Sequence, residues 1–469
     1  MQVRIGVFLL GGETEKMDAE LVRTRCYSYI CSVNRFERRP SGTHFFCVQR
    51  SIVKTFLPTR SYRREISGKN ASPLMKIESF SIQNYKCIKD LAVDCRGADG
   101  EIRQWTVLLG ENNTGKTNVL RALALLRPLE SEVEIVCNDG NKCITTKYVP
   151  TVLAAHPSTV IETMLTGGVK WGIGRSSRTI WADPIDLHIY GYGVSRYPAR
   201  VILSEREAKP GETLFRASAR LLDFQEWLLQ LDYSQKSGSE KSRKRLEKMH
   251  DLVSSDLFPG VTDFAFKKDS NNEHVMVVFT AGKDGDVRFE ELGFGYQTSL
   301  TWLADLCKRL FELYPDAENP LHEEAVVLVD ELDLHLHPKW QRDIVPTLSK
   351  VFPRVQFIVT THSPHVLQSM AEVNLYVLRR DETSGEITVE RSDVTDFTGW
   401  TVEEILSETM ELKDGVRSVV YNEKKRAFEN ALKAKDRQAA ERLYAELEQM
   451  MRPGNPMRSI YRIELEELA

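Results

Sequence analysis

An eight-residue loop between an apolar run and a helical pattern is the feature that most constrains the fold of this chain. Residues 110–117 read Gly-Glu-Asn-Asn-Thr-Gly-Lys-Thr and match the pattern G-x-x-x-x-G-K-[ST]. The apolar run 105–109 precedes the loop, and apolar residues at helical spacing follow it: Val119, Leu120, Leu123 and Leu126. A phosphate-binding loop requires this strand–loop–helix order. We therefore expect an α/β nucleotide-binding domain, although a glycine-containing turn can match the pattern by chance.

Each residue type in the loop has a chemical role in phosphate binding. Glycines let the backbone approach a phosphate closely, and successive N–H groups point at the anion. Lys116 is expected to reach the β- and γ-phosphates, and the Thr117 hydroxyl to bind Mg²⁺ at the N-terminus of a helix. We assign eight residues here to cofactor binding: Gly110, Asn112, Asn113, Thr114, Gly115, Lys116, Thr117 and Asn118.

A second segment carries two carboxylates. The apolar run Ala325–Val329 suits a strand buried on both faces of a parallel sheet, and Asp330 and Glu331 follow it directly. The carboxyl end of such a strand is where an open α/β sheet places its ligand. Asp330 is expected to hold Mg²⁺, and Glu331 to orient and polarise an attacking water.

A third segment follows after one helix-length. The range 338–351 can form that helix despite Pro346 inside it, and 356–360 has the apolar pattern of another buried strand. The sequence Thr361-His362-Ser363-Pro364 comes next. His362 can contact a γ-phosphate there, and the alternative is a capping or core histidine.

The order of these segments resembles the ABC-type ATPases of the SMC, RecF and OLD group. The resemblance rests on four stretches and covers about residues 75–469: 76–86, 110–117, 328–338 and 360–364. It implies an α/β P-loop NTPase head of the ABC type, with a mixed sheet, a helical insert and a C-terminal helical tail. It also implies ATP as the cofactor, Glu331 as the catalytic carboxylate and His362 as the switch histidine. Two heads would enclose ATP in a homodimer or higher oligomer.

The resemblance also requires a signature segment that acts on ATP held by the other subunit. The candidate is Glu291–Ser299, which opens a helical pattern. Gly293 stands where many relatives have serine, so Gly293 and Gly295 would contribute backbone N–H groups and the helix dipole. The alternative is a glycine-rich helix start that only packs. The pair His335 and His337 could be mistaken for a metal site, but a Zn²⁺ site needs further ligands that the nearby sequence lacks.

Composition indicates an ordinary globular protein. The chain has 469 residues, of which 42% are hydrophobic and 28% charged. No run approaches the roughly 18–20 apolar residues of a membrane span. The eight cysteines are scattered without a Cys-x-x-Cys pair. We therefore expect a reduced cytoplasmic protein with no membrane contact and no structural metal.

The first 74 residues differ from the rest. They carry 13 basic and 6 acidic residues, a net of +7, which leaves 50 basic and 61 acidic residues and a net of −11 for the remainder. Three interpretations are open: a basic nucleic-acid-binding arm, a flexible leader, or a translation start at Met75. We favour the start at Met75, because the family pattern begins there. A chain that begins at Met75 is then expected to fold and to hydrolyse ATP.

The expected domains are the extension 1–74, the head 75–398 with a helical insert at 201–256, and the helical region 399–469. In the head, 185–190 reads as a strand followed by a turn at 191–196, so Arg196 is either near the nucleotide or on the surface. The basic stretch 237–245 reads as a turn-rich link. It is either a solvated loop or a patch for phosphate backbones. A hairpin is expected at 275–279 and 287–290.

The C-terminal part is expected to add two edge strands, 374–378 and 386–390. A capping box at Thr401–Glu404 follows, and then a helix pair at 427–451 that ends at 453–456. This tail lacks the acidic cluster of a TOPRIM nuclease and any His-rich nuclease motif. The segment 399–406 and the closing helices resemble ATPases of antiphage systems such as Septu, which work with a separate HNH nuclease.

Three hypotheses follow for function. The first is an ATP-driven sensor and regulator of a partner nuclease in phage defence. The second is a DNA-repair or DNA-tethering ATPase that binds DNA itself. The third is a nucleotide-binding scaffold with little or no hydrolysis.

The tail has apolar faces that either bind the partner or pack on the chain's own sheet. The residues that form these faces are Trp400, Ile405, Leu406, Leu443 and Leu447.

Overall fold

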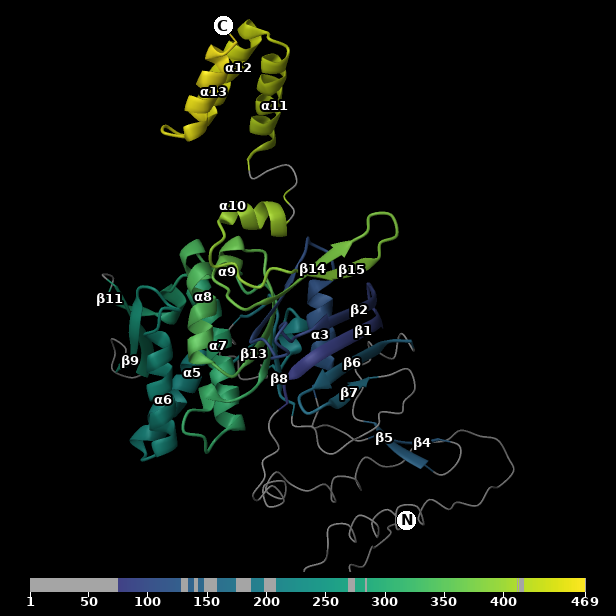
Figure 1. Cartoon of the computed structure of the whole chain (residues 1–469). Helices are drawn as coiled ribbons and strands as arrows, with labels where there is room; N and C mark the ends of the chain where they lie inside the picture. The colour runs from purple at the N-terminus through teal and green to yellow at the C-terminus, as the bar shows by residue number, and fades with distance from the viewer. Residues whose placement is uncertain are drawn as a thin grey trace, which may run out of the picture. The chain divides into compact units, whose positions relative to one another are not determined.

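A computed structural model describes most of the chain after residue 74 (Figure 1). The described residues are 75–127, 134–138, 142–146, 158–173, 187–197, 208–268, 275–282, 285–410, 412 and 417–468. The extension 1–74 and residues 201–207 of the expected insert lie outside these ranges. Within them, no helix combines the length and the apolar character needed to cross a membrane.

A mixed six-stranded sheet forms the centre of the head, in the order β15-β14-β3-β13-β12-β8. Five strands are mutually parallel: β3, β8, β12, β13 and β14. The sixth, β15, is antiparallel to its neighbour β14. The apolar runs predicted at 105–109, 326–329 and 356–360 are confirmed as strands, and all three are buried throughout. The strands are β3 (Trp105–Leu109), β8 (Ile189–Tyr192), β12 (Val326–Val329), β13 (Gln356–Thr360), β14 (Asn374–Arg380) and β15 (Ile387–Arg391).

Two strand predictions need correction. The strand expected at 185–190 is β8, which begins at Ile189 and runs through Gly191 and Tyr192, so these residues are not in a turn. The reason is close packing: a Cβ on Gly191 would lie 2.5 Å from Leu214 Cδ1, so glycine lets the strand continue under that side chain. The strand at 374–378 is not an edge strand, because β14 pairs with β3 on one side and β15 on the other.

A second, antiparallel sheet covers one side of the head. It has the order β2-β1-β6-β7, with β1 (Ile77–Tyr85), β2 (Ile88–Asp94), β6 (Val160–Leu165) and β7 (Val169–Ile173). The helix α3 (Lys116–Leu125) buries Val119, Leu120 and Leu123 in the core that β1 and β2 share with the inner face of the central sheet. Helix α3, which follows the phosphate loop, is therefore packed between the two sheets.

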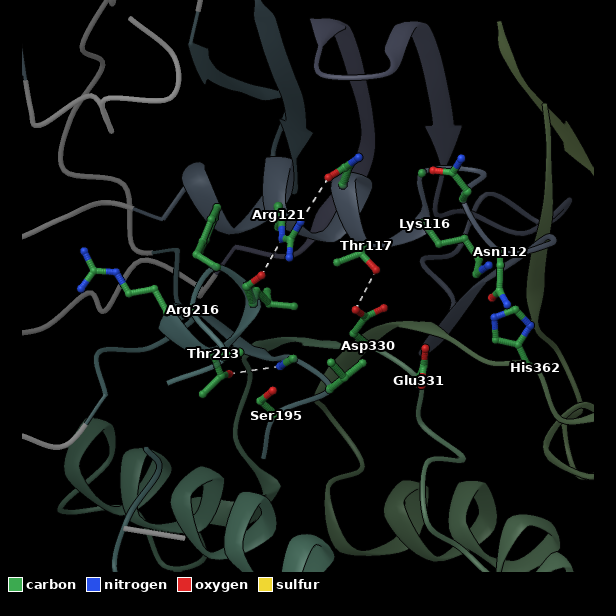
Figure 2. A pocket seen from close by; sticks show the side chains of 18 residues that line it. Asn112, Lys116, Thr117, Arg121, Ser195, Thr213, Arg216, Asp330, Glu331 and His362 are labelled. Carbon is green, nitrogen blue, oxygen red and sulfur yellow. Dashed lines mark hydrogen bonds between the residues drawn. The ribbon is translucent and has the colours of Figure 1, made fainter. Parts of the chain in front are cut away.

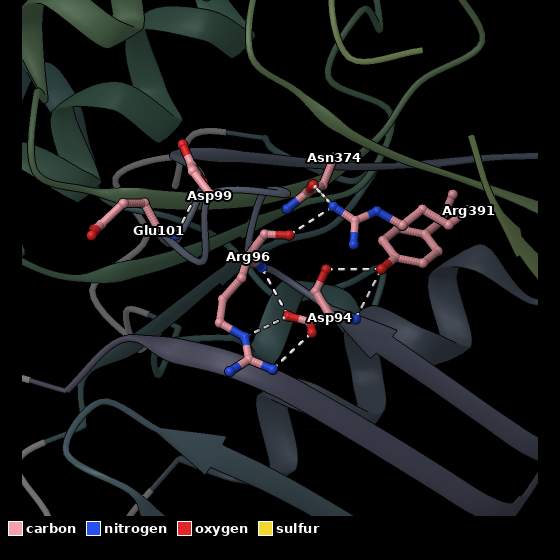
Figure 3. A network of polar contacts seen from close by, with 7 residues as sticks. Asp94, Arg96, Asp99, Glu101, Asn374 and Arg391 are labelled. Atoms are coloured by element: carbon pink, nitrogen blue, oxygen red, sulfur yellow. Dashed lines mark hydrogen bonds and ion pairs between the residues drawn. The ribbon is translucent and has the colours of Figure 1, made fainter. Parts of the chain in front are cut away.

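A polar network joins the two sheets (Figure 3). The Tyr376 hydroxyl of β14 accepts from the Asp94 N–H at 2.9 Å and donates to the Asp94 carbonyl at 2.8 Å. Arg391 of β15 donates to the Arg96 carbonyl at 2.7 Å and to Asn374 Oδ1 at 2.7 Å. These contacts join the end of β2 to the edge of the central sheet.

Helices and a small sheet cover the other side of the central sheet (Figure 1). The helices are α5 (Phe224–Lys236), α6 (Glu240–Val253), α7 (Phe294–Leu313) and α8 (Pro338–Val351), and the sheet contains β9 (Val261–Lys268), β10 (Val275–Ala281) and β11 (Gly285–Arg288). The helix predicted at 338–351 is thus confirmed. The predicted hairpin is also present, but its second strand is Gly285–Arg288 rather than 287–290, because Phe289–Glu291 forms a short 3-10 helix. A separate hairpin is formed by β4 (Glu134–Asn138) and β5 (Lys142–Thr146).

The insert differs from its prediction in two respects. Its described part is helical only from Phe224, where Asp223 caps α5, and 208–223 holds just the short turn Glu212–Leu214. The link at 237–245 is mostly helix, because Ser239 caps α6 and Glu240 begins it. Two basic residues of this helix pair with carboxylates: Arg243 with Glu240 and Glu247, and Lys241 with Asp316.

The C-terminal region contains two separate parts. Trp400 and Ile405 pack into the head core, near the capping box that begins α10 (Val402–Glu404) and the π-turn Ile405–Thr409. The helices α11 (Val419–Lys433), α12 (Arg437–Met450) and α13 (Pro456–Glu466) have a core of their own around Phe428 and Leu447. The helix pair predicted at 427–451 is α11 and α12, and it ends before residues 453–456 as predicted, although α11 begins earlier, at Val419. The third helix, α13, was not predicted: Asn455 caps it and Pro456 takes its first position.

Candidate nucleotide-binding site

A cavity of about 370 Å³ lies at the carboxyl ends of the central parallel strands (Figure 2). This is the edge at which an open α/β sheet places a ligand. The three segments singled out from the sequence meet here. The lining residues are Asn112, Asn113, Gly115, Lys116, Thr117, Asn118, Arg121, Gly193, Val194, Ser195, Thr213, Leu214, Phe215, Arg216, Ala217, Asp330, Glu331 and His362.

The phosphate loop is closed around its own lysine. Lys116 Nζ donates to the carbonyl oxygens of Gly110 at 2.7 Å and Glu111 at 2.8 Å. Burial lowers the pKa of Lys116, and the nearby carboxylates of Asp330 and Glu331 oppose that shift. Gly110 has φ 143°, and a Cβ there would lie 2.3 Å from the Leu378 carbonyl oxygen, so only glycine fits.

Asp330 stands at the centre of the acidic edge. Its Oδ2 accepts from Thr117 Oγ1 at 2.8 Å, and its Oδ1 accepts from Thr360 Oγ1 at 2.8 Å. The same Thr360 hydroxyl accepts from the Glu331 N–H at 2.7 Å. A threonine hydroxyl beside a carboxylate is an oxygen donor set that suits Mg²⁺. The residues present therefore fit the ion that the sequence predicts.

Glu331 occupies an uncommon backbone conformation. Its φ is 49°, in the left-handed region, although it carries a side chain. Arg196 Nη2 donates to the carbonyl oxygens of Glu331 at 2.6 Å and Asp330 at 3.1 Å. Arg196 is 3% exposed, so the interpretation as a surface residue is wrong. Arg196 contacts the backbone of the turn formed by Asp330 and Glu331, here called the acidic turn, and is not among the residues that line the cavity.

His362 lines the same cavity as Asn112 and Thr117 (Figure 2). Asp333 holds its backbone: Asp333 Oδ1 accepts from the His362 N–H at 3.1 Å and from Thr361 Oγ1 at 2.6 Å. Asp333, which lies two residues after Glu331, thus fixes the backbone of the segment Thr361–His362 at the end of β13.

The signature glycines are not brought to this cavity. Gly293 caps the N-terminus of α7, and Gly295 lies in its first turn against the carbonyl of His335. His335 contacts the ring of Phe294, and His337 caps α8. Among the residues that the structure describes, no group of three His, Cys, Asp or Glu side chains could hold a metal ion.

One wall of the cavity was not predicted from sequence. Thr213 Oγ1 accepts from the Gly193 N–H at 3.1 Å and donates to the Gly191 carbonyl at 3.2 Å, which fixes segment 213–217 over the end of β8. Arg121 Nε donates to the Leu214 carbonyl at 2.5 Å. Because β8 lies beside β12, its carboxyl end could have been expected at the cavity, which would have identified residues 193–195 as lining residues. Segment 213–217 matches no motif and could not have been identified in this way.

Family models match both halves of the site. A model described as "AAA ATPase domain" matches residues 75–148, which include the phosphate loop. A model described as "AAA domain, putative AbiEii toxin, Type IV TA system" matches residues 196–368, which include the acidic turn and His362. Both halves of the site thus match family models of AAA domains.

Proteins of antiphage systems are similar to this chain. The "Septu protein PtuA" of Bacillus thuringiensis is 29% identical over 249 residues, which are 52% of this chain and 62% of that protein. The "Retron Ec83 probable ATPase" of Escherichia coli is 46% identical over 92 residues, or 20% of this chain and 17% of that protein. The chain thus spans less than two thirds of the length of these curated relatives.

A solved structure is also similar to this chain. The SMC head domain from Thermotoga maritima is 14% identical, and the match covers 68% of this chain and all of that chain with a TM-score of 0.34. At this score the assignment of the fold rests on the strand order and the phosphate loop of the chain itself.

Proposed function

We propose that this ATPase binds Mg-ATP in the cavity and hydrolyses it between two head domains. The observation that carries the proposal is the bridge by which Asp330 joins the Thr117 hydroxyl of the phosphate loop to the Thr360 hydroxyl. A carboxylate in that position can hold Mg²⁺ together with Thr117. The bound ion would neutralise charge on the phosphates.

The residues of the chain have distinct proposed roles. The loop N–H groups and Lys116 bind the β- and γ-phosphates, which requires Lys116 Nζ to exchange its loop carbonyls for phosphate oxygens. Glu331 orients and polarises a water, and His362 contacts the γ-phosphate. Phosphoryl transfer depends mainly on such positioning and electrostatics.

The proposal includes a second head. Gly293 and Gly295 lie outside the cavity of their own chain, so their proposed role is to close on ATP held by another copy. A homodimer, or a higher oligomer built from such pairs, would satisfy this requirement.

We further propose that the ATPase is cytoplasmic and regulates a separate nuclease, of the HNH type, in bacterial antiphage defence. Its similarity to the Septu protein PtuA and to a retron ATPase supports this role. The sequence offers no nuclease cluster, so its output would pass to a partner. The alternative is direct binding of DNA in repair or tethering. The strongest basic stretch of the head gives that alternative less support, because Arg243 and Lys241 are paired with carboxylates.

Two substitutions test the ATP site. Lys116→Ala should abolish ATP binding, because it removes the cation between the phosphates. Glu331→Gln should retain binding and lose turnover by about 10²–10⁴-fold, as for a general base. Equilibrium binding of a fluorescent ATP analogue and phosphate release measure the two effects. Normal turnover by Glu331→Gln would reject the role of Glu331, and turnover stimulated by DNA alone would favour the alternative.

A further inference from the structure

We propose that Arg196 is a positioning residue that holds the backbone of Glu331 in its left-handed conformation and thereby aims the catalytic carboxylate into the cavity. This inference rests on the proposed function, since it assigns a role to Arg196 in the same hydrolysis. It goes further because Arg196 does not line the cavity and belongs to none of the three predicted segments.

The first argument is the geometry of the acidic turn. The backbone N–H of Asp330 donates to the Tyr192 carbonyl at 2.8 Å, and Arg196 Nη2 donates to the carbonyls of Asp330 and Glu331. Tyr192 of β8 and Arg196 therefore hold the backbone of the acidic turn, and neither of them lines the cavity. The Glu331 N–H is bound on the other side by Thr360 Oγ1. Both backbone polar groups of Glu331 are thus engaged, while its side chain lines the cavity.

The second argument is energetic. The left-handed conformation is energetically unfavourable for a residue that carries a side chain. Such a conformation persists only where neighbouring groups enforce it. A hydrogen bond from a charged donor is stronger than one between neutral groups, so the Arg196 contact to the Glu331 carbonyl can help to enforce this conformation.

The third argument is the burial of the guanidinium. Burial lowers the pKa of Arg196 to about 10, and the carboxylates of Asp330, Asp333 and Glu331 oppose the shift. Arginine stays protonated in proteins, so the side chain is a cation. Its guanidinium carbon lies 6.0 Å from the ring centre of Trp302, a buried residue of α7. A buried cation with this set of neighbours has little freedom to move away from the turn.

The test compares Arg196→Met with Arg196→Lys in the full chain. Methionine keeps the length and apolar character of the side chain but donates no hydrogen bond. We expect Arg196→Met to lower kcat about 10–100-fold with a KM within about threefold of wild type, because the phosphate loop is unchanged. Lysine retains a charged hydrogen-bond donor but lacks the planar guanidinium group that contacts both carbonyls. Arg196→Lys should therefore have a smaller effect and lower kcat about 3–10-fold.

A double variant distinguishes positioning from general destabilisation. If Arg196 acts through Glu331, adding Arg196→Met to Glu331→Gln should lower the residual kcat by less than about threefold. Arg245→Met is the matched control: Arg245 also donates to a carbonyl, that of Phe311 at 3.1 Å, but it does not line the cavity. This control should keep the wild-type kcat.

Each outcome has a definite meaning. A wild-type chain that neither binds nor hydrolyses ATP contradicts the proposed function itself. An active wild type with an unchanged kcat in Arg196→Met, or with additive effects in the double variant, overturns the role of Arg196. If Arg196→Met does not fold, Arg196→Lys decides, and an unchanged kcat in that variant overturns the inference.

Discussion

The Cα of Gly295 faces the carbonyl oxygen of His335 so closely that a Cβ on this glycine would lie 2.3 Å from that oxygen. Gly295 belongs to the first turn of α7, and His335 to the loop between the acidic turn and α8, with φ 64°. The signature segment and this loop are therefore in direct backbone contact within one chain.

This contact predicts different outcomes for two neighbouring glycines. Gly295→Ala should lower the free energy of unfolding by about 1–3 kcal/mol, because backbone atoms must shift to admit the methyl group. Gly293→Ser is the control, since the nearest atom to a Cβ there is Tyr296 Cδ2 at 3.5 Å and serine suits a helix N-cap. Its unfolding free energy should stay within about 0.5 kcal/mol of wild type in urea titrations. Equal stability of the two variants would contradict the contact.

Thr360 is predicted to be essential for the acidic turn. Its side chain is fully buried and is bound to both Asp330 and Glu331. Thr360→Val keeps the shape but leaves two buried polar groups unpaired, so we expect a loss of about 1–3 kcal/mol for each, together with reduced ATP turnover. Chemical denaturation and phosphate release measure both effects.

Thr360→Ser serves as the control for that experiment. It keeps the hydroxyl and removes only a methyl group, so its turnover should remain closer to wild type. A valine variant that is as active as the serine variant would show that the hydroxyl does not orient the turn.

Tyr85 is predicted to tolerate loss of its hydroxyl. Its ring is buried at the end of β1, and its hydroxyl has no hydrogen-bond partner within the described ranges. Tyr85→Phe should therefore be as stable as wild type near pH 7, or about 1 kcal/mol more stable. Urea titration measures this, and a clear loss of stability would mean that the hydroxyl is bonded.

The same variant gives a pH-dependent prediction. Burial raises the pKa of Tyr85 to about 12 from its ordinary 10.0. Between these values the folded chain holds the proton more tightly than the unfolded chain, so the Tyr85 contribution makes the unfolding free energy fall as pH rises. Tyr85→Phe should lose less stability than wild type from pH 10 to 12, and parallel curves would contradict the burial of the hydroxyl.

The tail is predicted to be dispensable for ATP binding. Among the described residues, none after Met410 belongs to either core of the head, whereas α11 to α13 share a core of their own. Deleting 415–469 should leave ATP binding at least partly intact and remove association with the partner nuclease, as measured by co-purification. Unchanged complex formation would shift the partner site to α5 and α6.

A longer deletion is the informative comparison. Trp400 packs against Phe397, and its carbonyl accepts from Gln368 Nε2 at 2.8 Å. Ile405 is fully buried in the head core. A chain that ends before Trp400 should therefore lose stability, in contrast to one that ends at residue 414.

The sequence was most informative where burial and local chemistry agree. The strands 105–109 and 356–360 and the helix 338–351 match their predictions at both ends, because buried parallel strands are continuously apolar and because His337 and Pro338 form a clear helix start. Predictions failed where one residue type has two uses. Gly191 suits a turn but also a strand under close packing, and Pro456 can follow one helix or begin the next.

The site was predictable as far as its motifs extend. The cavity is lined by five residues that the sequence assigned to the site: Lys116, Thr117, Asp330, Glu331 and His362. The segment 213–217 was not predictable, because it lies about a hundred residues from the phosphate loop and matches no motif, and tertiary packing alone places it over β8. The burial of Arg196 depends on the same packing. The proposed contacts of Gly293 and Gly295 depend on a second copy and remain a prediction.

The two hydrogen bonds from Lys116 to the carbonyls of Gly110 and Glu111 have a consequence for the rate at which a nucleotide is captured. These bonds lie within the chain, so folding itself fixes the curved shape of the loop, and most of its conformational entropy is lost during folding rather than on binding. A ligand therefore meets a preorganised loop and has only to exchange two carbonyl contacts. Association should then proceed in a single fast phase, with no slow ordering step after the first encounter.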